Sequence, residues 1–198
     1  MSSYLLIACA YLLGSVPVGI LLAKMKGTDP RKVGSGNIGA TNVMRAAGKL
    51  TGALTLVGDV LKGLLPVAAA FMLDKPSLVV AAVGLAAFLG HLFPIFLKFK
   101  GGKGVATALG VYLGLDPLAV LIAVIVFVLL LLKWRFVSLG SLVGVAVMPL
   151  LLYLRNAPNQ YIYLVLIIGT LIFLKHKDNI RRLIAGTENK LGRSKQSD

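Results

Sequence analysis

Most of the residues that could do chemistry lie in three short polar segments of an otherwise strongly apolar chain. The segments are residues 33–48 (VGSGNIGATNVMRAAG), 98–110 (KFKGGKGVATALG) and 175–189 (KHKDNIRRLIAGTEN). They supply Arg45, Lys103 and Arg182 as cations and His176 as their only histidine, whereas the whole chain holds seven acidic residues. A site with this balance suits a substrate that brings the negative charge itself, such as a phosphate.

The first segment contains G-x-G-x-x-G from Gly34 to Gly39, with Asp59 at the offset expected of a dinucleotide fingerprint. The preceding stretch AKMKGTDPRK is not a strand, and Asp59 lies in an apolar run, so this fold is excluded. The glycines still allow backbone N–H groups to approach a phosphate. ATNVMRAAG predicts a short interfacial helix on which Thr41 and Arg45 share a face. The alternative is a tight turn between two membrane spans.

The second segment surrounds Lys103 with Gly101, Gly102 and Gly104, and a helix is expected to start at about Val105. It lacks the spacing of a nucleotide-binding P-loop. Backbone donors, a helix N-terminus and a fixed cation together favour an anion site. A simple positive anchor at the membrane surface is the alternative, but that would not require three glycines.

The third segment predicts a helix with His176, Asn179 and Arg182 in one polar stripe. Gly186 is typical of a helix end, and Glu188 lies just beyond it. A histidine at a membrane boundary is as compatible with a structural role as with a catalytic one. No His, Cys and Asp group has metal-ligand spacing, so we expect neither a metal nor another cofactor.

The elements that must position these segments are membrane helices. The chain has 198 residues, of which 58% are hydrophobic and 14% charged, and its mean hydropathy is +0.88. A soluble domain carries about a quarter charged residues. Six apolar runs cover 4–23, 51–73, 77–97, 117–132, 136–154 and 161–174. They predict an all-α integral membrane protein.

The distribution of charge predicts the topology. The net charge is +14, and basic residues concentrate in 24–49, 98–103, 133–135 and from 175 onward, which the positive-inside rule places in the cytoplasm. The loops 98–103 and 133–135 can both be cytoplasmic only if the chain between them enters the membrane and returns. We therefore predict seven transmembrane helices, with Val105–Leu115 short or re-entrant. The N-terminus is expected outside and the C-terminus in the cytoplasm, with short cytoplasmic interfacial helices.

Several other features receive simpler interpretations. The basic charges rim a membrane, so nucleic-acid binding is not expected. His91 and Asp59 are expected to pair between helices, although function is also possible for intramembrane polar groups. Ser138 and Ser141 are interpreted as helix N-caps or as substrate contacts. Residues 1–198 form a single integral-membrane domain with a polar tail at about 191–198.

The three segments resemble the motifs of the bacterial acyl-phosphate:glycerol-3-phosphate acyltransferase family, and the resemblance covers essentially the whole chain. The first motif is matched by GSGNIGATN with Arg45, the second by KGGKGVAT, and the third by His176, Asn179, Ile180, Arg182, Leu183, Gly186 and Glu188. The resemblance implies a seven-helix enzyme of the bacterial inner membrane with its active site on the cytoplasmic side.

The implied reaction transfers a fatty acyl group from acyl phosphate to the 1-hydroxyl of glycerol 3-phosphate, giving lysophosphatidic acid and phosphate. The implied partners are these two substrates, the lipid bilayer and the soluble enzyme that makes acyl phosphate. The expected catalytic residues are His176, Asn179, Arg45, Lys103 and Ser35. The expected substrate-binding residues are Gly36, Asn37, Thr41, Asn42, Gly101, Gly102, Gly104, Ser141, Arg182 and Glu188. The proton of the attacking hydroxyl goes either to His176 or to a substrate phosphate, and the second is favoured because no acid is clearly placed to tune the histidine.

Other classes fit less well. The H-x-x-x-x-D pair of acyl-CoA-dependent acyltransferases is absent, since the fifth residue after His91 is Phe96 and after His176 is Arg181. The main alternative is a small membrane transporter or channel for phosphate-bearing solutes. No polar stripe continues through the spans, which speaks against it.

Overall fold

The computed structural model describes residues 1–192, and all the regular structure in this part of the chain is helical. The helices are α1 (Ser3–Ser15), α2 (Val18–Lys24), η1 (Pro30–Lys32), α3 (Ala40–Ala47), α4 (Lys49–Met72), α5 (Ser77–Leu92), η2 (Ile95–Leu97), α6 (Val105–Leu115), α7 (Pro117–Trp134), α8 (Val137–Leu154), α9 (Asn159–Lys175) and α10 (Lys177–Ile184). Residues 193–198, most of the expected polar tail, lie outside the described residues. Leu191 is tied to the bundle, because its N–H donates to the carbonyl of Arg135 at 2.8 Å.

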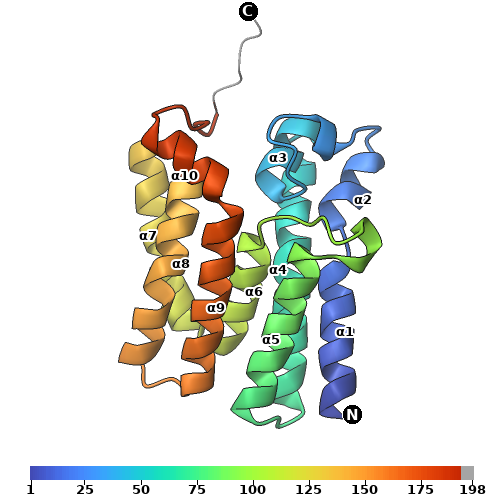
Figure 1. Ribbon diagram of the computed structural model, residues 1–198, viewed down its shortest axis with the longest axis vertical. Helices are drawn as coiled ribbons and strands as arrows, with labels where there is room; N and C mark the ends of the chain where they lie inside the picture. Colours follow the sequence, from blue (N-terminus) through green and yellow to red (C-terminus); the bar gives the residue numbers. More distant parts are fainter. Residues whose placement is uncertain (193–198) are drawn as a thin grey trace, which may run out of the picture.

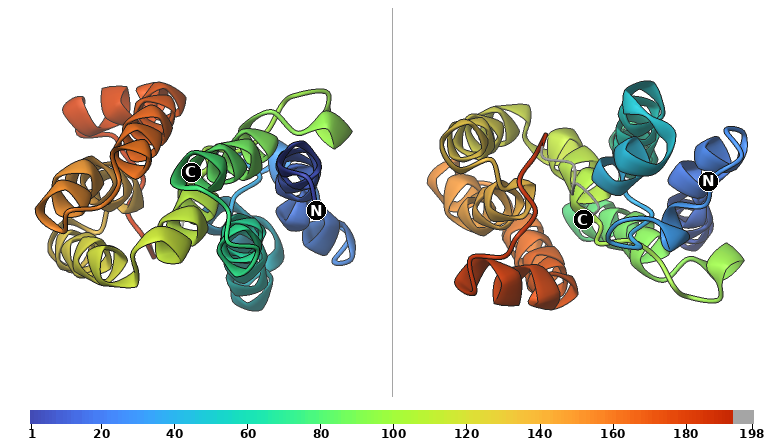
Figure 2. Two further views of the ribbon diagram at one scale, coloured as in Figure 1. Left: turned by 90° about the horizontal axis from the view of Figure 1, so that it is seen from below. Right: turned by 90° about the horizontal axis from the view of Figure 1, so that it is seen from above.

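The long helices stand side by side in one upright bundle (Figure 1). The N-terminus lies at one end, and the short helices α3 and α10 lie at the other (Figure 1). Seen along the bundle, α7, α8 and α9 form one group and α1, α4 and α5 another, with α6 between them (Figure 2). The short helices thus bring the first and third polar segments to the same end of the molecule.

The apolar runs predicted from sequence correspond to helices of membrane-spanning character. Five segments are long and apolar enough to cross a membrane, and α9 with α10 forms a sixth candidate that bends by 62°. The first run is interrupted, because Val16 is extended and Pro17 separates α1 from α2. The third run also ends early as a helix, since Phe93 precedes Pro94 and a residue before proline is disfavoured in the α conformation.

Helices α1 and α5 pack with their backbones in direct contact. A Cβ atom on Gly14 would lie 2.1 Å from the carbonyl oxygen of Ala87, and one on Gly90 would lie 2.3 Å from that of Tyr11. Only glycine fits at these two positions. Small residues that permit such close approach are a main source of helix association in membranes, where apolar burial between helices gives little.

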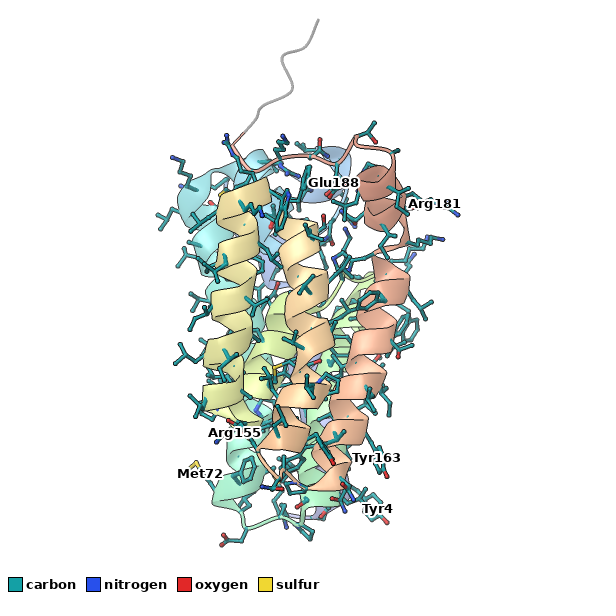
Figure 3. All side chains as sticks on the ribbon, turned by 90° about the vertical axis from the view of Figure 1, so that its left-hand side faces the viewer. Tyr4, Met72, Arg155, Tyr163, Arg181 and Glu188 are labelled. Carbon is teal, nitrogen blue, oxygen red and sulfur yellow. The ribbon has the colours of Figure 1, made fainter. Side chains whose placement is uncertain are left out.

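Helix α6 has 11 residues, compared with 24 in α4 and 18 in α7, and it packs against α4 in the same manner. Cβ atoms on Gly63 and Gly110 would lie 2.2 and 2.0 Å from carbonyl oxygens of the facing helix. At its far end, Asp116 caps α7 by accepting from the N–H of Ala119 at 2.9 Å and forms an ion pair with Arg155. Figure 3 shows Arg155 toward the end opposite to Glu188.

The predicted helix-to-helix pairing of Asp59 and His91 is confirmed. Asp59 Oδ1 on α4 lies 3.6 Å from His91 Nδ1 on α5 and 2.8 Å from Lys62 Nζ on its own helix. The N-cap interpretation of Ser138 and Ser141 is wrong, because the cap of α8 is Phe136 and no side chain bonds there. Ser138 instead donates to Glu188, and Ser141 donates to the carbonyl of Val137.

Candidate active site

A cavity of about 470 Å³ is lined in part by residues of α3 and α10, the two short helices that lie at the same end of the bundle. It is lined by residues of all three polar segments and continues between α6, α7 and α8. Twelve of the residues expected at the site line it: Ser35, Asn37, Thr41, Asn42, Arg45, Lys103, Gly104, Ser141, His176, Asn179, Arg182 and Glu188. The fold therefore brings together segments that are far apart in the sequence.

The first glycine-rich loop is organised around the buried side chain of Asn42. Its Nδ2 donates to the carbonyls of Pro30, Val33 and Asn37 at 2.7–3.0 Å, and its Oδ1 accepts from the N–H of Ser35 at 3.0 Å. Since its amide is fully engaged by the loop, Asn42 shapes the site and offers no free donor. Thr41 and Arg45 remain on the cavity side of α3, as their spacing predicts.

The second segment places a cation at the start of a helix. Gly104 is the N-cap of α6 and has a φ of 84°, a left-handed conformation that glycine adopts without strain. Val105 and Ala106 line the cavity, so the N-terminal end of α6 borders it. Lys103 Nζ donates to Asn179 Oδ1, which links the second segment to the third.

The third segment surrounds a carboxylate with donors. Glu188 accepts from Asn179 Nδ2 at 2.6 Å, from Arg182 Nε at 2.7 Å and from Ser138 Oγ at 2.8 Å. Ser138 comes from α8, so this carboxylate joins α8 to α10. Burial alone would raise the pKa of Glu188, but the hydrogen bonds from Asn179, Arg182 and Ser138 lower it.

His176 lies at the break between α9 and α10 and is held as a neutral imidazole. Its Nδ1 donates to the carbonyl of Ile172 at 2.8 Å, so Nε2 carries the free lone pair. Burial lowers the pKa of His176 to about 4; the Ile172 carbonyl opposes the shift, and the charge of Lys103 adds to it. Burial likewise lowers the pKa of Lys103.

Three of the expected binding residues do not line the cavity. Gly36 is an exposed residue of the first loop, whereas Gly101 and Gly102 pack against α5. A Cβ on Gly101 would lie 2.1 Å from the carbonyl oxygen of His91, and one on Gly102 would lie 2.4 Å from its Nε2. These two glycines therefore permit close packing of the loop and do not contribute to the cavity wall.

The apolar arm of the cavity is the part that sequence reasoning missed. It is lined by side chains of α6, α7 and α8, among them Leu109, Tyr112, Phe127, Val145 and Met148. Leu109 and Tyr112 recur at helical spacing on α6, as do Val145 and Met148 on α8, but the same pattern describes any core helix. Asp59 and His91 also line the cavity.

The geometry suits a ligand with an anionic head and an apolar tail. Three basic side chains and a neutral imidazole face the polar part of the cavity, and the apolar arm continues from it. Within residues 1–192, no group of three or more His, Cys, Asp or Glu side chains is arranged to hold a metal ion.

Comparison with known proteins gives one consistent result. The profile of the family described as "Glycerol-3-phosphate acyltransferase" matches residues 4–186. Proteins of that name from Geotalea daltonii and Trichlorobacter lovleyi are 56% and 57% identical to this chain over 188 and 184 residues. These matches cover 95% and 93% of this chain, and 97% and 95% of the relatives.

Two solved structures have the same fold. Both are described as PlsY (YgiH), an integral membrane glycerol 3-phosphate acyltransferase. The glycerol 3-phosphate form has a TM-score of 0.94 and 44% identity, and the lysophosphatidic acid form has 0.91 and 42%. Each match covers 97% of this chain and 96% of the other. The chain is an all-helical integral membrane protein and belongs to the glycerol-3-phosphate acyltransferase family.

Proposed function

We propose that this protein transfers a fatty acyl group from acyl phosphate to the 1-hydroxyl of glycerol 3-phosphate, forming lysophosphatidic acid and phosphate. The observation that carries the proposal is that one cavity has a polar part lined by Arg45, Lys103, Arg182 and His176. An apolar arm continues from this polar part. The relatives named for this activity, and the structures described by its acceptor and its product, support acyl transfer over solute transport.

The reaction needs no covalent intermediate with the enzyme. The 1-hydroxyl oxygen of glycerol 3-phosphate bonds to the acyl carbon, the bond between that carbon and the phosphate oxygen breaks, and phosphate leaves. Acyl phosphate is already an activated mixed anhydride, so positioning and charge stabilisation suffice. Arg45 provides a bidentate fork for one phosphate, and Lys103 provides a point charge at the start of α6.

The released proton goes to a phosphate oxygen of a substrate. A phosphate monoester has a second pKa of about 6. His176 has a pKa of about 4, so its imidazole is the weaker base. The free Nε2 of His176 accepts a hydrogen bond from the attacking hydroxyl and orients it. Asn179 holds Lys103 in place, while Ser35 donates to a phosphate.

The site lies on the cytoplasmic side of a bacterial inner membrane in this proposal. The single domain of residues 1–198 crosses the membrane seven times, with α6 as the shortest crossing. The N-terminus is outside, the C-terminus is inside, and α3 and α10 lie in the cytoplasmic interface. Acyl phosphate reaches the site from the soluble enzyme that makes it, and its tail occupies the apolar arm. No nucleic acid takes part.

The function is tested with purified protein in detergent. We expect phosphate release from acyl phosphate only when glycerol 3-phosphate is present, and no lysophosphatidic acid from acyl-CoA supplied as a parallel donor. Activity confined to sealed vesicles would contradict the proposal and favour transport. Equal turnover with acyl-CoA would overturn the assignment of the donor.

The topology is tested by labelling in sealed inverted and right-side-out vesicles. Cysteines are introduced singly at Asn156, in the α8–α9 turn, and at Lys26, after α2, in a Cys9→Ala background. An impermeant maleimide should label position 156 only from outside and position 26 only from inside. The reverse pattern would overturn the orientation.

A further inference from the structure

Three ionisable side chains lie buried inside the bundle and are not used by the proposed reaction. Asp59 and Lys62 lie on α4 and His91 on α5, and each side chain is 4–5% exposed. Ionisable groups within membrane spans are costly to bury and are retained where they serve a function. This buried triad, Asp59–Lys62–His91, therefore calls for a role.

The triad is linked to the interrupted first span. Lys62 Nζ donates to the carbonyl of Val16 at 3.0 Å, at the break between α1 and α2. Shortly after this break, Gly19 packs against the first glycine-rich loop, since a Cβ there would lie 2.2 Å from the carbonyl oxygen of Ile38. The lysine is thus a second donor to this carbonyl, which also accepts from the N–H of Val18 at 3.0 Å, and it ties α4 to the break before that loop.

The triad is also in contact with the second glycine-rich loop, through His91. The N–H groups of Gly101 and Gly102 donate to the carbonyls of Leu92 and His91 at 3.2 and 3.3 Å. A Cβ on Gly102 would lie 2.4 Å from His91 Nε2 and 3.3 Å from Cγ1 of Ile38. Gly102 therefore lies between the imidazole ring and the first loop, one residue before Lys103.

We propose that Asp59, Lys62 and His91 are positioning residues that fix the two glycine-rich loops relative to each other. Asp59, whose charge Lys62 neutralises, lies 3.6 Å from Nδ1 of His91, a nitrogen with no hydrogen-bond partner within residues 1–192, and attracts this side of the ring. The ring in turn limits how closely Gly102 can approach α5. The position of Gly102 then determines where Lys103, the next residue, lies relative to Arg45. This inference rests on the proposed function, because it assigns the triad to the alignment of the two cations that hold the substrate phosphates.

The inference is tested with the single variants His91→Ala and Gly102→Ala and their combination. A misplacement of about 1 Å can cost about 100-fold in rate, so each single change should lower kcat/KM by about 10- to 100-fold, mainly through KM for glycerol 3-phosphate. The combination should be no worse than the poorer single variant, because removal of the ring makes room for the added methyl group. If the loss in kcat/KM of the double variant equals the product of the two single losses, the proposal is overturned.

Gly101→Ala is the matched control for this comparison. Its added Cβ would meet backbone carbonyls of His91 and Leu92, which truncation of the His91 side chain leaves in place. The effect of Gly101→Ala should therefore multiply with that of His91→Ala. If His91→Ala restored kcat/KM in Gly101→Ala as much as in Gly102→Ala, a specific contact between the ring and Gly102 would be contradicted.

A purely structural role of the triad would give a different result. His91→Gln, which keeps a polar group near Asp59, should recover much of the kcat/KM lost in His91→Ala. If His91→Ala lowers the melting temperature but leaves KM for glycerol 3-phosphate unchanged, the proposal is overturned. Should Gly102→Ala not be recovered in folded form, Asp59→Asn decides the question by the same KM criterion.

Binding of glycerol 3-phosphate, measured by titration calorimetry, separates this inference from the proposed function. Wild-type protein that binds glycerol 3-phosphate but transfers no acyl group would overturn the function alone. The variants should then still show the same coupling, as fold-changes in Kd. Unchanged Kd values in all of them would overturn the positioning role.

Discussion

Replacing Arg45 by alanine should remove substrate binding energy without unfolding the protein. Arg45 is exposed on α3 and lines the cavity, and within residues 1–192 it makes no ion pair. The proposed function has Arg45 donate two charge-assisted hydrogen bonds to a phosphate, and each bond of this kind is worth about 1.5–3 kcal/mol. Because the side chain is exposed we take the lower value, about 3 kcal/mol in total, which corresponds to a roughly 150-fold loss in kcat/KM.

The assay measures phosphate release in detergent over a range of both substrates, alongside the melting temperature. Arg45→Lys is the matched control, since it keeps the charge but not the bidentate geometry, and it should lose only about 10-fold. The melting temperatures of both variants should stay at the wild-type value. If a well-folded Arg45→Ala protein kept kcat/KM within about threefold of wild type, Arg45 would not contact substrate and the assignment of the first segment would fail.

Three further changes probe the rest of the structure. His176→Gln should reduce the fall in melting temperature between pH 6.5 and pH 4. The neutral ring of His176 stabilises the fold fully above its unfolded pKa of 6.5, and that stability is lost as the pH falls toward about 4. The same fall in the variant as in wild type would contradict the burial of His176. Glu188→Gln should lower the free energy of unfolding by about 2 kcal/mol, because Arg182 loses its charged partner; an unchanged melting temperature would refute this. Arg155→Gln should cost at most about 1 kcal/mol and leave kcat/KM unaltered, since its pair with Asp116 is partly exposed and lies at the other end of the bundle; a kinetic defect would show that the two ends are coupled.

The spans could be predicted from sequence because the membrane imposes a length and an apolar composition on them. Each of the six apolar runs became a helix or an interrupted helix, and 105–115 was recognised as too short for a normal crossing. The Thr41 and Arg45 face of α3 followed from helical periodicity alone. The break at Pro17 was not predicted, because a proline in a long apolar run signals either a kink or a helix boundary.

The contacts that close the site could not be predicted, since they depend on how distant helices meet. Glu188 was expected just beyond a helix end, as one of the substrate-binding residues. After Gly186, with a φ of 69°, the chain turns back so that this carboxylate meets Ser138 of α8. Gly101 and Gly102 were assigned to phosphate binding by their type, yet their role in packing against His91 depends on the position of α5.

The contact between α1 and α5 has a consequence for biosynthesis. Helix α1 is synthesised first, but the helix whose backbone fits against Gly14 follows only after α4 has been made. Lipid gives α1 no strong reason to associate elsewhere, so its glycine surface stays open to acyl chains during translation. A ribosome that stalls before Ser77 would therefore leave this glycine surface of α1 in contact with acyl chains in place of α5.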